Sequence, residues 1–220
     1  MEDADSDAAV GTLIDGAMFI FGRCCCSIER IYVVESLFVS FVEKAVQIVQ
    51  AYKLGNPLDT ETTLGPIAQE RSANEVSTQT YEAVAAGAIP LISPTLFTQD
   101  SDAYLMSQIL VNVDHTMRAM REESFGPVVG IMPVKDYPTA ITLMNDSNFG
   151  LMASLWTKNP KRAEFIANQI STVTNYMKCV DYLDPALCWT GCKDTGRSGG
   201  LSIIGYHNLT RPKSYHLKKA

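Results

Sequence analysis

The feature of this sequence that most constrains its fold is the alternation of short β-branched runs with longer segments of helical periodicity. Residues 28–34 (IERIYVV) are short and rich in Ile, Val and Tyr, which predicts a strand. Residues 36–54 carry apolar side chains at helical spacing, with Ser36 as a candidate N-cap and Gly55 as a stop. Strands alternating with helices of this length are typical of a layered α/β domain with a largely parallel sheet.

The same alternation continues along the chain. A buried strand is expected at 128–134, directly after a Gly-Pro turn, and a short helix at 137–145. Beyond Thr195 the pattern is interrupted by Gly, Ser and Pro, so we expect a tail in which 206–217 could add a strand to another surface. The other predicted elements are helices at 8–22, 70–86 and 160–169 and strands at 90–92, 109–113, 151–156 and 172–177.

Composition and charge exclude several classes of protein. With 220 residues, 46% of them hydrophobic, the chain can bury a sizeable core. Its net charge of −6 argues against nucleic acid as a partner, because such surfaces are usually basic. No apolar run reaches the roughly 18 to 20 residues of a membrane-spanning helix, and the acidic residues 1–7 fit neither a secretory signal nor a transit peptide. We expect a cytoplasmic protein that binds neither membranes nor nucleic acid.

The cysteines are the most unusual part of the composition. Three of the six are adjacent, which suits a disulfide framework poorly, because bridges need defined Cα separations. Paired C-x-x-C spacings and nearby histidines, the usual signs of zinc, are lacking, so we expect no metal. Free thiols are the favoured interpretation. The cysteines are Cys24, Cys25, Cys26, Cys179, Cys188 and Cys192.

The triplet lies in residues 19–30, FIFGRCCCSIER. A cysteine on a loop between a helix and a strand can be held exposed at a sheet edge, where backbone amides would stabilise the oxyanion formed when the thiol attacks a carbonyl. Arg23 or Arg30 would favour the thiolate, which is the nucleophilic form. The alternative is that all three cysteines pack as small core residues.

This segment resembles the active-site cysteine signature of the aldehyde dehydrogenase family, in which Phe, Gly-Gln, the nucleophile and Arg recur at set spacings. The resemblance implies that Cys25, three residues after Gly22 and five before Arg30, is the catalytic nucleophile. Two positions depart from the signature: Arg23 replaces the usual Gln, and Ile20 replaces a common Asn.

A second segment, residues 122–129 (EESFGPVV), resembles the family's Glu-Glu-x-Phe-Gly-Pro-Val motif. Read alone, it is an exposed acidic loop that leads into a strand. The resemblance implies that Glu123 hydrogen-bonds the ribose on the nicotinamide side of the cofactor and that Phe125 packs near the same sugar. A carboxylate suits this role because it accepts from two vicinal hydroxyls.

Further stretches match the family in order and spacing across nearly the whole chain. Each is a turn signal that is weak by itself, and the strength lies in their common order. Trp189 stands where the family often has an aromatic residue lining the aldehyde tunnel, although a plain core Trp is an equal alternative. The matching stretches are 55–66, 145–151 and 191–196, together with Asn175.

The resemblance implies a fold and a reaction. We expect the α/β catalytic domain of an aldehyde dehydrogenase over residues 1–195, without the Rossmann-type cofactor domain, and a tail with an oligomerisation strand over 196–220. In the family, the thiolate adds to the aldehyde, NAD or NADP accepts the hydride, and a Glu-activated water releases the acid. That Glu belongs to a segment upstream of the cysteine which we do not find here. We therefore expect weak or absent cofactor binding and no activity of the chain alone.

Two other functions stay open. The chain could be a non-catalytic truncated remnant that associates with full-length aldehyde dehydrogenase subunits through residues 206–217. It could also act as an esterase through Cys25, which would stall at the acyl-enzyme without the Glu.

Overall fold

The computed structural model describes residues 1–93 and 103–219. Its main sheet has the order β1-β4-β3-β2. Strands β1 (Arg30–Val34) and β3 (Gln108–Val111) both pair in parallel with the central strand β4 (Val128–Val134), and the short edge strand β2 (Ile89–Pro90) runs antiparallel to β3. The predicted α/β class with a largely parallel sheet is confirmed.

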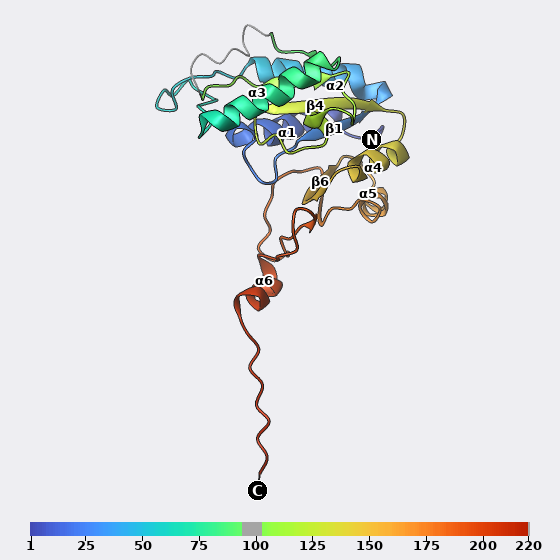
Figure 1. Ribbon diagram of the computed structural model, residues 1–220. Coiled ribbons are helices and arrows are strands. Elements are labelled where there is room, and N and C mark those ends of the chain that lie inside the picture. Colours follow the sequence, from blue (N-terminus) through green and yellow to red (C-terminus); the bar gives the residue numbers. More distant parts are fainter. Residues whose placement is uncertain (94–102, 220) are drawn as a thin grey trace.

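Helices cover both faces of this sheet, as the upper part of Figure 1 shows. One face packs against α1 (Ser6–Met18) and α2 (Glu35–Gln50) in a single apolar cluster. The other face packs against α3 (Glu70–Ala85). Because side chains alternate along a strand, β4 supplies both clusters: Val129 and Ile131 belong to the first and Val128 to the second.

A second layer of elements lies beside the main sheet (Figure 1). Strands β6 (Met152–Leu155) and β7 (Thr174–Met177) pair in parallel and share a small apolar cluster with α5 (Pro160–Ala167). The same layer contains α4 (Tyr137–Asn145), β5 (Phe149–Gly150) and β8 (Cys192–Lys193). Elsewhere in the chain are two short 3₁₀ segments, η1 (Phe19–Gly22) and η2 (Arg118–Met120). No helix within the described ranges is long and apolar enough to span a bilayer.

Two details near the N-terminus differ from expectation. The predicted helix at 8–22 ends at Met18, because Ile20 and Phe21 adopt left-handed backbone angles and break the helical path. Ser36 is not a cap: α2 begins at Glu35 and has no side-chain cap hydrogen bond.

The C-terminal segment corrects a further expectation. We predicted a strand at 206–217, but its first residues belong to a helix, α6 (Ser202–Leu209). Residues 210–219 form no regular element and lead away from the body of the chain in Figure 1. The domain boundary at 195 and the oligomerisation role of the tail stay predictions.

Candidate active site

The three adjacent cysteines lie on a tight turn between η1 and β1. The amide of Ser27 donates to the Cys24 carbonyl at 3.0 Å, which closes the turn. The Ser27 hydroxyl is within hydrogen-bond distance of two carbonyls at the end of α1, those of Gly16 and Ala17. The turn is therefore fastened to α1. It leaves Cys25 exposed and buries Cys26, which is 1% exposed.

A glycine contact joins this turn to the second motif. Gly22 has φ of +64°, and a Cβ there would overlap the Gly126 carbonyl oxygen and lie 2.8 Å from the Ala17 oxygen. Only glycine combines this backbone angle with so close an approach. The cysteine segment and the Phe-Gly-Pro turn, far apart in the sequence, thus touch backbone to backbone. Across the same junction the Arg23 guanidinium lies 5.9 Å from the centre of the Phe125 ring.

The exposed cysteine opens onto a large cavity of about 490 Å³. Cys25, Glu122 and Glu123 all line it, so the thiol and the acidic pair share one cavity. Phe125 and Trp189 are not among its lining residues. Trp189 is half-buried and exchanges backbone hydrogen bonds with Gly200 at 2.8 and 2.9 Å, which leaves its role in an aldehyde tunnel a prediction.

The two adjacent glutamates differ in their surroundings. Glu122 pairs with Arg118, which also binds Glu75 and Glu82 on α3, so Glu122 belongs to a surface ion cluster. The Glu123 carboxylate has no hydrogen bond or ion pair with any residue in 1–93 or 103–219, and partial burial raises its pKa. Of the pair, Glu123 is the one whose carboxylate is available to a ligand.

Glu29 is a site residue that the sequence analysis missed. Its carboxylate accepts from the Ser124 hydroxyl at 2.6 Å and from the amides of Ser124 and Phe125 at 3.1 and 3.3 Å. Burial raises the pKa of this carboxyl, against the opposing effect of the three hydrogen bonds. Glu29 therefore holds the acidic turn against the cysteine segment. The sequence offered one sign of this role, because Glu29 is an acidic residue inside a predicted apolar strand at 28–34.

Replacing Glu29 with Gln is expected to lower the free energy of unfolding by about 1 kcal/mol at pH 7, because an amide satisfies the buried donors less well. The raised pKa adds a pH dependence. The stability contributed by this carboxyl is fully present below its ordinary value of 4.5 and is lost as the pH rises through its folded-state value. The wild-type advantage should therefore shrink with rising pH. Urea unfolding of both proteins at several pH values tests this. Glu43→Gln, on an exposed position of α2, is the control, and an advantage that grows with pH contradicts the prediction.

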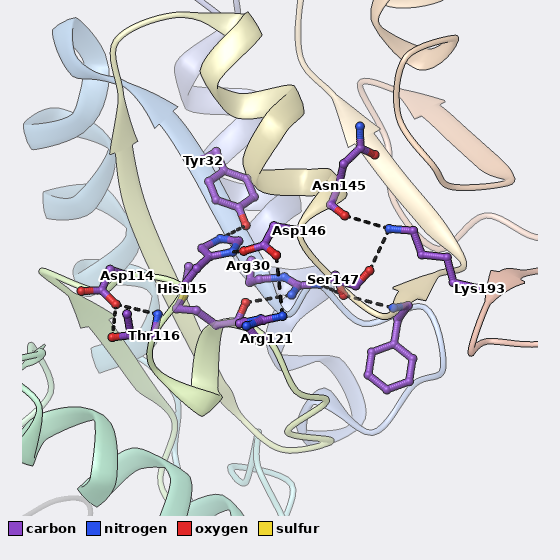
Figure 2. Close-up of polar contacts among 12 residues, drawn as sticks. Arg30, Tyr32, Asp114, His115, Thr116, Arg121, Asn145, Asp146, Ser147 and Lys193 are labelled. Carbon is purple, nitrogen blue, oxygen red and sulfur yellow. Dashed lines mark hydrogen bonds and ion pairs between the residues drawn. The ribbon is translucent and has the colours of Figure 1, made fainter.

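Arg30 serves a different purpose from the one considered in the sequence analysis. Its guanidinium donates to the Met120 carbonyl at 2.8 Å and to the Ser147 hydroxyl at 3.3 Å. Figure 2 shows Lys193 reaching the same turn, where its ammonium donates to the carbonyls of Asn145 and Ser147 at 2.9 and 2.8 Å. Three of the family-like segments therefore meet at this turn, and Arg30 joins them rather than contacting a cysteine.

A second polar chain in Figure 2 runs from β1 to the end of α4. The Tyr32 hydroxyl and His115 Nε2 are 2.9 Å apart, and His115 Nδ1 lies 2.9 Å from an Asp146 carboxylate oxygen. Burial raises the pKa of Tyr32 to about 12, so this phenol stays protonated at neutral pH. The contacts connect the main sheet to the turn that Arg30 also binds.

The thiols differ in protonation as well as in exposure. Burial raises the pKa of Cys26, and the neighbouring Cys24 thiol and the Asp181 carboxylate add to the effect. Burial also raises the pKa of Cys179. Both are therefore protonated, poorly nucleophilic thiols at neutral pH. Of the cysteine side chains, that of Cys25 is the exposed one.

Together, the fold and the site define an α/β domain with an exposed thiol and a carboxylate that line the same cavity. The chain belongs to the aldehyde dehydrogenase family, whose sequence model matches residues 1–215.

Curated relatives match along almost the whole chain. It is 31% identical to succinate semialdehyde dehydrogenase [NAD(P)+] Sad of Escherichia coli, over 95% of this chain and 45% of that protein. It is 28% identical to betaine aldehyde dehydrogenase 2 of Rhizobium meliloti, over 94% of this chain and 44% of that protein. The chain therefore spans less than half the length of these relatives.

Solved structures agree with the sequence matches. A structure that concerns cofactor and substrate selection by Gox0499 superposes with a TM-score of 0.91 at 29% identity, over 99% of this chain and 47% of that one. Betaine aldehyde dehydrogenase from Staphylococcus aureus in complex with NAD+ gives a TM-score of 0.88 at 28% identity, over 94% and 42%. The expected family and its fold are confirmed.

Proposed function

We propose that this chain provides the thiol-bearing part of a site that oxidises an aldehyde to a carboxylic acid with NAD or NADP. Cys25 is the nucleophile in this proposal. The supporting observation is its position, exposed on a fixed turn and facing the cavity that Glu123 also lines.

The residues of the chain divide the work as follows. The Cys25 thiolate adds to the aldehyde carbon. Glu29 and Gly22 keep the Glu123 turn against the cysteine turn. Glu123 suits a ribose because its carboxylate is exposed and can accept from two vicinal hydroxyls. NAD or NADP, when bound, supplies the acceptor for the hydride that leaves the aldehyde carbon.

Turnover is expected to need residues that this chain does not show. Loss of a general base typically slows a reaction by about 10²- to 10⁴-fold. We therefore expect the chain alone to add its thiolate to the aldehyde and form a thiohemiacetal. Turnover of the aldehyde is expected only when NAD or NADP and the remaining part of a family site are supplied.

Selective labelling of Cys25 tests the nucleophile. A thiol-alkylating probe should label Cys25 faster than Cys179 or Cys188, because Cys25 is exposed and the other two are only partly so. Mass spectrometry of peptides after short exposures gives the three rates. The comparison is internal to one protein, so a change in probe concentration does not affect it. Equal or slower labelling of Cys25 contradicts its assignment.

Association with other subunits is a second candidate function, favoured by the exposed apolar surface of the C-terminal segment. Ile203, Leu209 and Leu217 are 76%, 85% and 85% exposed. A protein partner that covers these side chains would remove their apolar area from water. Mixing the chain with a full-length aldehyde dehydrogenase and measuring the molar mass by light scattering tests this function. A chain shortened after residue 201 lacks all three side chains and serves as the control, and binding that survives the shortening contradicts the role of the C-terminal segment.

A further inference from the structure

The three thiols of the cysteine turn converge on one point. The Sγ atoms of Cys24, Cys25 and Cys26 all lie within 4.8 Å of one another, and those of Cys24 and Cys26 are 3.2 Å apart. In an extended strand the middle side chain would point to the opposite face. The turn closed by Ser27 removes that alternation. The spacing rule that argued against a metal in the sequence analysis concerns paired C-x-x-C ligands and nearby histidines, and it does not cover three adjacent cysteines on one turn.

We propose that the cysteine turn is a binding site for one thiophilic d¹⁰ cation of the Zn²⁺ and Cd²⁺ type. Zinc–sulfur bonds are about 2.3 Å long, which separates the sulfurs of a tetrahedral site by about 3.8 Å. The Cys24 and Cys26 sulfurs, 3.2 Å apart, are closer than this, and the other two separations are at most 4.8 Å. Rotation about the Cα–Cβ bonds is the adjustment that the proposal requires.

The graded exposure of the thiols suits capture of an ion from solution. Cys26 is buried and fixed, Cys24 is partly exposed, and Cys25 is exposed toward the cavity. An ion that enters from the cavity contacts the Cys25 sulfur first and is then bound by the less exposed sulfurs of Cys24 and Cys26 as well. Three protein ligands leave the fourth position open on the cavity side for water or another small ligand.

The charges around the turn are compatible with the complex. Binding exchanges three thiol protons for the cation, M²⁺ + 3 RSH → M(SR)₃⁻ + 3 H⁺, so the complex carries one negative charge. Arg23 precedes Cys24, and its buried Nη1 has no hydrogen-bond partner among the described residues. Its guanidinium can balance that charge. Asp181 acts on Cys26 in the opposite sense. Arg30 is held by Met120 and Ser147 and takes no part (Figure 2).

A bound cation has a consequence that rests on the proposed function. It occupies the sulfur of Cys25 and so prevents attack on an aldehyde, which makes the site a reversible block on the nucleophile. Cys24 and Cys26 then have a role of their own. Together with Cys25, they form a three-sulfur chelate for the cation.

Titration of the full chain with Cd²⁺ tests the site. The expected result is one ion per chain, an ultraviolet sulfur-to-cadmium charge-transfer band, and loss of three thiols from reaction with a colorimetric thiol reagent. Cys24→Ser and Cys26→Ser should each weaken binding by more than the roughly 10- to 100-fold typical of losing an outer-shell partner. Cys179→Ser and Cys188→Ser are matched controls and should bind like the wild type.

The outcomes separate this proposal from the proposed function. Equal Cd²⁺ affinity in all four variants, or absence of the charge-transfer band in the wild type, overturns the metal site. Slow alkylation of Cys25 together with tight, triplet-dependent Cd²⁺ binding overturns the nucleophile and leaves the metal site standing. Circular dichroism of each variant shows whether it is folded. Because Cys24 is partly exposed, its Ser variant gives a result even if Cys26→Ser fails to fold.

Discussion

Cys25→Ser should abolish the burst of nitrophenolate that the wild-type chain releases from an activated nitrophenyl ester. Under the proposed function, a burst of one equivalent per chain is expected because the thiol is acylated faster than the acyl-enzyme is hydrolysed. A serine hydroxyl at the same place is a far weaker nucleophile. The acylation rate should fall by about 10⁴-fold or more, the order seen when a catalytic nucleophile is removed.

Cys24→Ser is the matched control for this experiment. It changes the same atom on the adjacent residue of the same turn, and Cys24 is less exposed than Cys25. Its burst should keep the amplitude of one equivalent and most of the rate, because Cys24 does not line the cavity that Cys25 faces. If Cys25→Ser keeps the burst, or Cys24→Ser loses it, the nucleophile has been misassigned.

Gly22→Ala should have the largest effect on stability of any single methyl group added to the chain near the site. The new Cβ would overlap the Gly126 carbonyl oxygen and lie 2.7 Å from its carbon and 2.8 Å from the Ala17 oxygen. All three are backbone atoms, so no flexible side chain can move aside. The left-handed backbone angle and the overlap together should lower the free energy of unfolding by about 3 kcal/mol or more. Chemical denaturation measures this loss.

Two other glycines separate the sources of that loss. Gly87 has φ of +110° and nothing within 4 Å of an added Cβ, so Gly87→Ala should lose only the conformational part, about 1 to 2 kcal/mol. Gly11 lies inside α1 with open space and an ordinary angle, so Gly11→Ala should stabilise by about 0.5 to 1 kcal/mol. A Gly22 variant no less stable than the Gly87 variant would show that the two backbones do not touch.

The regular elements could be predicted because their signals are local. β4 and α4 were predicted with the bounds that the structure shows, since a buried apolar run and an Asp-Tyr-Pro start define their ends. The tail could not be predicted in this way. Its residues 202–209 mix Ile and Tyr with small polar residues, and local patterning favoured short extended stretches where the structure has α6.

The site was predictable only where a residue carries its own signal. Cys25 and Glu123 were found because their neighbours in sequence form recognisable motifs. The role of Glu29 and the backbone angles of Ile20 and Phe21 were not predicted, because both depend on contacts with residues that are remote in sequence. The left-handed backbone at 20–22 is explained by the close approach of the Gly126 backbone, which the sequence does not reveal.

The contact at Gly126 also extends away from the cleft. On its other side, a Cβ at Gly126 would lie 2.9 Å from a methyl group of Val76, on the inner face of α3. Helix α3, the Gly126 backbone, the Gly22 backbone and the last turn of α1 thus lie in successive contact. A larger side chain at Val76 would press on the Gly126 backbone and, through it, on the turn that carries Cys25. Such a substitution is expected to change the reactivity of the sulfur without replacing any residue that lines the cavity.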